Sequence, residues 1–131
     1  MENNLKQITA QDVIDLLQEN KIELKSTHNK LCLPIINRLY KKMSLGIMFS
    51  GIKVVDNLII DGHHRYLASL LANKKLDIYS SNRTTATTVT EWESVVFVDD
   101  DWDTKAKIEM LNEQDAKYND VSLDEIIKLV Y

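Results

Sequence analysis

The chain has 131 residues, of which 44% are hydrophobic and 27% are charged, a composition typical of one globular domain and not of a disordered or fibrous protein. No apolar run approaches the roughly 18 residues of a membrane span, and the N-terminal residues lack the apolar stretch of a secretory signal. Cys32 is the only cysteine, which excludes an internal disulfide and a cysteine-based zinc site. We therefore expect a single domain over residues 1–131, located in the cytoplasm and without membrane contact.

The charge is divided unevenly along the chain. Residues 1–83 carry 12 Lys and Arg against 8 Asp and Glu, whereas residues 84–131 carry 4 against 12. The first part is thus mildly basic and the last part strongly acidic, so a uniformly basic nucleic-acid-binding surface is not expected. The basic part can hold a phosphate ligand, and the acidic part would either repel a nucleic-acid backbone or cover the basic face.

The first third of the chain is predicted to be mainly helical. Residues 9–19 have an apolar face at helical spacing, with Thr9 as the N-cap. Residues 22–24 alternate and predict a short strand, and residues 26–30 predict a polar loop. A second helix is expected to begin near Pro34 and to end before Gly46.

The middle of the chain predicts a hairpin followed by a helix. Residues 52–55 and 58–60 are apolar strands, and the Asp56-Asn57 pair between them favours a tight turn because both residues tolerate a positive φ. A helix is expected from His63 to about Asn73, and a further short strand over residues 76–79.

The last third predicts a strand and two helices. Residues 80–90 are rich in Ser and Thr and indicate a loop or an exposed strand, and residues 95–98 a buried strand. Helices are expected over residues 104–115, capped by Asp103, and over residues 122–130, opened by a capping box. Tightly mixed helices and short strands indicate a single small α+β domain, a mixed sheet flanked by helices with two C-terminal helices.

The segment Asp61-Gly62-His63-His64-Arg65 has the composition of an anion site. It brings a glycine and cationic side chains to the start of a helix, where the first N–H groups lack internal partners and the helix dipole favours negative charge. Gly62 would let a ligand approach the backbone, and the planar Arg65 fork can hold two phosphate oxygens.

The order of elements around this segment resembles the ParB/sulfiredoxin superfamily. The resemblance covers residues 33–80, is sharpest over Ile60 to Tyr66, and leaves the acidic extension of residues 99–131 outside. It implies that Gly62, His63, His64 and Arg65 contact the phosphates of a nucleotide. The residues of the motif are most similar to those of the kinase-related branch of the superfamily.

The resemblance also implies catalytic roles, with clear departures. Asp61 would orient the turn or a metal ion, His64 would serve as an acid or base, and Glu23 is the nearest match to a carboxylate of the free-serine kinases. His63 stands where sulfiredoxins have a reactive cysteine, so that thiol chemistry is not expected. The acidic end of the chain replaces the DNA-binding region of partition proteins, so DNA partition is not expected either.

The leading hypothesis is a protein that binds ATP or CTP with Mg²⁺ and acts as a kinase or NTPase by phosphoryl transfer. A second hypothesis is a ParB-like nuclease, such as an interbacterial toxin module, with the same residues on a nucleic-acid phosphate. A third is a non-enzymatic immunity or adaptor module that binds a protein partner through the acidic C-terminal helices.

Simpler structural roles compete with each of these assignments. Adjacent histidines at a helix start point about 100° apart, so one can bind phosphate while the other packs, and two histidines alone make a poor metal site. Arg65 would otherwise form a salt bridge, and Asp61 would belong to the turn. The run of Asp99, Asp100, Asp101 and Asp103 offers oxygen ligands for Mg²⁺ but is also typical of a solvated loop. Trp92 and Trp102 would either stack on a base or serve in core packing or a protein interface. Lys41 and Lys42 are expected on a solvated helix face.

Overall fold

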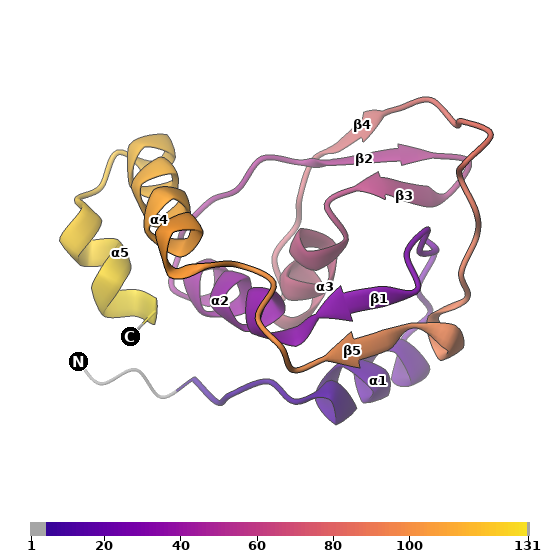
Figure 1. The fold of residues 1–131 in the computed structure, drawn as a ribbon, viewed down its shortest axis with the longest axis horizontal. Helices are drawn as coiled ribbons and strands as arrows, with labels where there is room; N and C mark the ends of the chain where they lie inside the picture. The colour runs from indigo at the N-terminus through magenta and orange to yellow at the C-terminus, as the bar shows by residue number, and fades with distance from the viewer. Residues whose placement is uncertain (1–4, 131) are drawn as a thin grey trace.

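The computed structural model describes residues 5–130 as a small α+β fold (Figure 1). A three-stranded sheet lies on one side, a two-stranded sheet crosses the middle with helices on its flanks, and the last two helices pack at the opposite end. The α+β class expected from the sequence is confirmed. None of the described helices is long and apolar enough to cross a membrane.

The N-terminal segment is anchored by a capping box and a buried asparagine. Helix α1 (Ala10–Glu19) begins at Thr9, whose hydroxyl accepts the Asp12 N–H while the Asp12 carboxylate accepts the Thr9 N–H. Ahead of the cap, the Asn37 side chain accepts the Ile8 N–H at 2.7 Å and donates to the Ile8 carbonyl at 2.8 Å. Both backbone groups of Ile8 are thereby satisfied inside the core.

The three-stranded sheet has the order β3-β2-β4. β2 (Ile52–Val55) pairs antiparallel with β3 (Leu58–Asp61) through the expected turn, in which Asp56 and Asn57 have φ values of 49° and 62°. β4 (Ile78–Ser80) pairs parallel with β2 and begins two residues later than the sequence predicted.

Two helices and a short parallel sheet form the main core. α2 (Leu33–Ser44) and α3 (His63–Leu71) pack together, and β1 (Lys30–Cys32) runs parallel to β5 (Val96–Val98). A 3-10 turn, η1 (Trp92–Ser94), leads into β5. The buried side chains that these elements share are apolar: Ile8, Val13, Leu31, Leu33, Ile36, Leu67, Val95 and Phe97.

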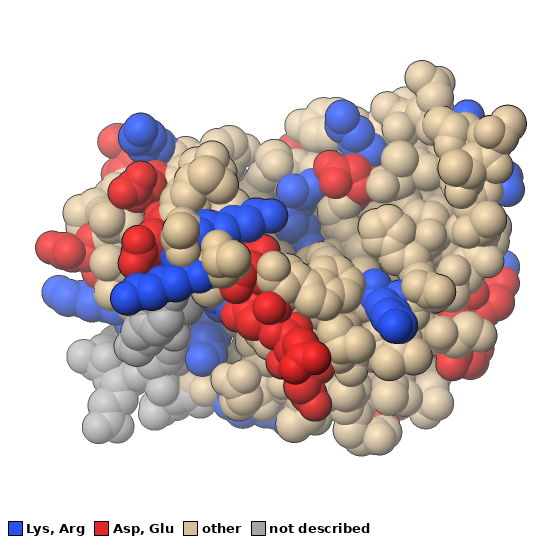
Figure 2. All heavy atoms as spheres, viewed as in Figure 1, with Lys and Arg blue, Asp and Glu red and all other residues tan. Residues whose placement is uncertain are grey.

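The acidic C-terminal extension folds back on the rest of the chain. α4 (Lys105–Asn119) and α5 (Leu123–Val130) pack on each other and enclose a separate apolar cluster of Ile47, Ala116 and Ile126. Figure 2 shows acidic side chains in a band across this face, with basic side chains beside it. Arg38 of the basic part is paired with Asp101 and Asp103, and Lys42 with Asp115, so the acidic part covers some of the basic side chains.

Several local expectations need correction. Residues 22–24 form no strand, and only isolated bridges at Lys25 and Ser26 follow them. Lys30 was expected to end a loop, but it is the first residue of β1 and pairs with β5. α4 continues to Asn119 and is capped by Thr104, whose hydroxyl accepts the Lys107 N–H, and not by Asp103.

Candidate functional site

A cavity of about 500 Å³ lies between the start of α3, the exposed side of α2 and the inner face of α4. This volume falls within the roughly 300–1,000 Å³ of typical small-molecule sites. Its charged lining consists of four basic and three acidic residues: Arg38, Lys42, Arg65 and Lys107, with Asp61, Asp103 and Asp115. The cavity is therefore slightly cationic in a chain whose formal net charge is −4.

Gly62 shapes the end of the cavity at α3. Its φ of +101° lies in the left-handed region that favours glycine, and a Cβ there would come within 2.6 Å of Ile52 Cγ2 and 2.8 Å of Arg65 Nη2. No side chain caps the first turn of α3. The first N–H groups of this helix are therefore left available beside a backbone that carries no side chain.

Arg65 lies over Gly62 with only part of its hydrogen-bonding capacity used. Its Nη2 donates to the Gly51 carbonyl at 3.2 Å and to the Asp61 carboxylate at a long 3.4 Å. Its Nε is buried and has no hydrogen-bond partner among residues 5–130. A buried, unpaired guanidinium nitrogen is costly in the absence of a partner, and here it belongs to a side chain that lines the cavity.

His63 has a structural partner. The ring is 2% exposed, and its Nε2 accepts the Thr27 backbone N–H at 3.0 Å. The His28 ring stacks on it with centroids 4.0 Å apart. Because Nε2 is the acceptor, the ring proton resides on Nδ1.

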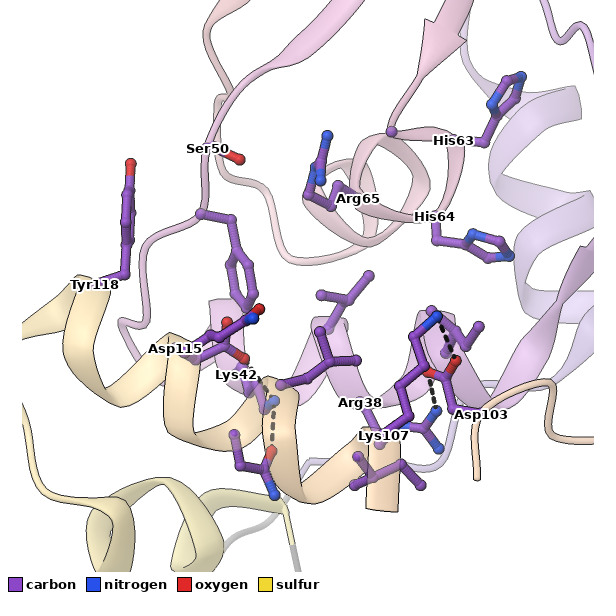
Figure 3. Close-up of a pocket in the computed structure, with 18 of the residues that line it drawn as sticks. Arg38, Lys42, Ser50, His63, His64, Arg65, Asp103, Lys107, Asp115 and Tyr118 are labelled. Carbon is purple, nitrogen blue, oxygen red and sulfur yellow. Dashed lines mark hydrogen bonds and ion pairs between the residues drawn. The ribbon is translucent and has the colours of Figure 1, made fainter. Parts of the chain in front are cut away.

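His64 has the same arrangement on the other side of the helix start. Its Nε2 accepts the Cys32 N–H at 2.9 Å, and Trp102 meets the ring edge-on at 5.5 Å. The two histidines thus fasten α3 to the segments before and within β1. Figure 3 shows the two rings on the same side of the α3 start but pointing in different directions, in line with the expected divergence of adjacent helical residues.

Both imidazoles are held in the neutral form. Burial, with smaller contributions from the nearby His28 and His64, lowers the pKa of His63 to about 3. Burial, with a contribution from His28, lowers the pKa of His64 to about 4. At pH 7 each ring therefore offers a neutral Nδ1–H donor, while its lone pair is already used by a backbone amide.

The other cations of the cavity are committed to acidic partners. Arg38 holds Asp101 with both terminal nitrogens, at 2.6 and 3.0 Å, and Asp103 at 3.0 Å. The Arg38 guanidinium keeps the pKa of Asp101 below its usual value through these hydrogen bonds. Lys107 lies 3.6 Å from Asp103. Arg65, whose ion pair to Asp61 measures 3.4 Å, and Lys107 are therefore the two loosely paired cations of the lining.

Lys42 corrects the expectation of a solvated helix face. It is only 3% exposed, and its ammonium donates to Asp115 at 2.7 Å and to Asn112 at 2.8 Å. These contacts join α2 to α4 and fix one wall of the cavity (Figure 3).

The walls away from α3 are largely apolar. They are formed by side chains of α2, α4 and the segment between α2 and β2: Ile35, Leu39, Met48, Phe49, Ile108, Leu111 and Tyr118. The cavity therefore has a polar end at Arg65 and an apolar side along α4, as expected of a site for a ligand that is part ionic and part apolar.

The lining does not fit a preassembled magnesium site. Among residues 5–130 no group of three or more His, Cys, Asp or Glu side chains is placed to hold a metal ion. Asp103 and Asp115 are taken up by basic partners, so Asp61 is the least committed carboxylate of the lining. No step is therefore assigned to a resident metal.

The structure brings together most of the site residues expected from the sequence. Asp61, Gly62, His63, His64 and Arg65 all line the cavity. Glu23 is exposed and does not line it; its charge acts instead on Tyr66, raising the pKa of that phenol together with the larger effect of burial.

Sequence reasoning missed the contribution of α4. Lys107, Ile108 and Tyr118 line the cavity, although they lie in the segment treated as an acidic extension. The only local signal was the alternation of apolar and basic residues within that helix. Comparison of the chain with protein-family models, with curated proteins and with solved structures found no match.

Proposed function

We propose that the chain binds a nucleotide, with its phosphates at the start of α3, and that it carries out phosphoryl transfer from that nucleotide. The observation that carries the proposal is the Arg65 guanidinium, which lines a cavity of nucleotide size and makes only long internal bonds, to the Gly51 carbonyl at 3.2 Å and to the Asp61 carboxylate at 3.4 Å. A phosphate oxygen in the cavity would accept from this guanidinium, and charge-assisted hydrogen bonds of this kind are the strong ones.

The surroundings of Arg65 support the same ligand. The uncapped first turn of α3 offers backbone N–H groups to an anion, and Gly62 leaves room for it. Neutral His64 can add its Nδ1–H as a further donor without bringing a second buried charge. The neighbouring acidic extension would repel the long phosphate backbone of a nucleic-acid strand more strongly than the few phosphates of a mononucleotide, which favours a mononucleotide.

The reaction is assigned mainly to positioning and electrostatics. Neither histidine has a free lone pair, so the acceptor is activated by Asp61, the least committed carboxylate of the lining. The oxygen of water or of an acceptor hydroxyl forms a bond to the terminal phosphorus as the bond to the leaving phosphate breaks, and its proton passes to Asp61. Magnesium would arrive with the nucleotide phosphates, as is usual for this ion.

Binding is tested by isothermal titration calorimetry with ATP, CTP, GTP and pyrophosphate, each with and without Mg²⁺. Wild-type protein should bind at least one nucleotide, and Arg65→Ala should abolish the binding. Arg83→Ala is the matched control, because Arg83 is exposed in a loop and does not line the cavity. Equal binding by wild type and Arg65→Ala would refute the site, and no binding of any of these compounds would refute the function.

Catalysis is tested separately with Asp61→Asn and Glu23→Gln. Release of phosphate from the bound nucleotide should be lost in Asp61→Asn while its affinity changes little, and Glu23→Gln should behave as wild type. Full activity in Asp61→Asn would remove the proposed role of that carboxylate and leave the binding site intact.

A further inference from the structure

Two large apolar side chains stand exposed at the edge of the cavity. Met48 is 71% exposed and Tyr118 is 62% exposed, and both line the cavity. The hydroxyl of Tyr118 has no hydrogen-bond partner in the part of the chain that the structure describes. Single exposed apolar residues are ordinary, but these two come from different segments and border the same hollow.

The backbones beneath these side chains are held together firmly. Asn119, the neighbour of Tyr118, accepts the Met48 N–H at 2.6 Å and donates to the Met48 carbonyl at 3.0 Å. Its amide also donates to the Asp115 carbonyl at 2.9 Å, which holds it against α4. The backbones that carry the two exposed side chains are therefore fixed, although neither side chain is buried by the protein. The Tyr118 ring has only two χ angles, so it loses little freedom when it binds a ligand.

The position of Tyr118 relative to Arg65 indicates what it would bind. In the view of Figure 3, Tyr118 rises from α4 on one side, Arg65 lies on α3, and Ser50 stands between them. The wall near Tyr118 is apolar, with Phe49 and Leu111 among its side chains. A ligand anchored by phosphate at Arg65 and extending along the cavity would place its non-ionic part on this wall.

We propose that Tyr118 is the platform on which the nucleobase of the bound nucleotide stacks. This inference rests on the proposed function, since it requires the phosphates to be held at Arg65. A nucleobase is flat and has a π-face, and aromatic side chains stack on bases with little dependence on which base it is. The site would then prefer nucleotides over inorganic polyphosphates and would discriminate weakly among the bases.

The test compares ATP with tripolyphosphate, which has the same number of phosphates and lacks both the ribose and the base, so the Tyr118 variants isolate the contribution of stacking. Calorimetric affinities are measured for wild type, Tyr118→Phe, Tyr118→Leu and Tyr118→Ala. Wild type should bind ATP about tenfold or more tightly than tripolyphosphate, in line with the roughly 1–3 kcal/mol that one stacked base contributes. Tyr118→Phe should keep that preference, and Tyr118→Leu and Tyr118→Ala should lose most of it while still binding tripolyphosphate.

Met110→Ala is the matched control, because Met110 is also an exposed apolar residue of α4 and does not line the cavity. It should keep the wild-type preference for ATP. If wild type and all Tyr118 variants show the same ratio of ATP to tripolyphosphate affinity, the stacking role is refuted and the phosphate site stands. If wild type binds neither compound, the proposed function fails and the stacking role fails with it.

Discussion

The buried histidines should make the stability of this protein fall sharply between pH 7 and pH 5. Both rings accept a backbone N–H through Nε2, at 3.0 Å for His63 and 2.9 Å for His64. Protonation would replace each acceptor by a donor that faces another donor, in a site largely removed from water. In the unfolded chain both rings are exposed to water and can be protonated without this penalty.

The sign and size of the effect follow from the two pKa values. An ordinary histidine has a pKa of 6.5, and folding lowers it to about 3 for His63 and about 4 for His64. Between pH 6.5 and pH 4 the unfolded state thus binds more protons, so the free energy of unfolding decreases as the pH falls and is level above about pH 7. At pH 5 the loss is about 2 kcal/mol for each ring, or about 4 kcal/mol together.

The assay is urea unfolding at pH 7, 6 and 5, followed by the fluorescence of Trp92 and Trp102. His63→Gln and His64→Gln keep a side-chain acceptor and remove the titrating group, so each single variant should lose about half of the pH dependence and the double variant most of it. Working at pH 5 and above keeps the ordinary carboxylates largely ionised. If the double variant lost as much stability between pH 7 and 5 as wild type, the assigned roles of the two rings would be wrong.

Three further predictions concern single contacts. Lys42→Ala should destabilise the protein by about 3–5 kcal/mol in urea unfolding, because it leaves the Asp115 carboxylate without its 2.7 Å partner. Asn37→Ala should cost about 2–3 kcal/mol, because both backbone groups of Ile8 lose their partner, and the Ile8 amide should exchange its hydrogen faster. Gly62→Ala should lower the free energy of unfolding by more than the roughly 1–3 kcal/mol of backbone strain alone, because its Cβ would also collide with the core.

Matched variants separate these effects from general sensitivity to substitution. Lys41→Ala is the control for Lys42→Ala, and Asn82→Ala is the control for Asn37→Ala. Each control should change the free energy of unfolding by less than about 0.5 kcal/mol. If a control lost as much stability as its partner variant, the assigned contact would be contradicted. Gly46→Ala is the control for Gly62. Gly46 has a φ of +100°, but a Cβ there would meet nothing within 4 Å. If Gly62→Ala lost no more free energy of unfolding than Gly46→Ala, the predicted collision of the added Cβ at Gly62 would be contradicted.

Local chemistry was enough to predict the features that depend on neighbouring residues. The Thr9 cap, the Asp56-Asn57 turn and the glycine at the start of α3 each follow from φ preferences or from a side-chain hydrogen bond a few residues away. The course of the chain from residue 52 to residue 71 was therefore predicted closely, and with it the part of the site on α3.

Contacts between distant residues could not be predicted in this way. β1 is three residues long and depends on β5, 66 residues further along the chain. Lys42 looked like a solvated lysine because nothing near it in the sequence shows that Asp115 will meet it. The structural use of both histidines depends equally on distant backbone amides, those of Thr27 and Cys32.

The division of charge along the chain takes on a different meaning in the folded protein. The basic first part and the acidic last part meet through Arg38 with Asp101, just before α4, and through Lys42 with Asp115 of α4, so opposite charges help to dock α4. The docked α4 builds the apolar side of the cavity, opposite the end that Arg65 lines. A segment whose net charge argued against anion binding thus completes the cavity in which we propose that an anion binds.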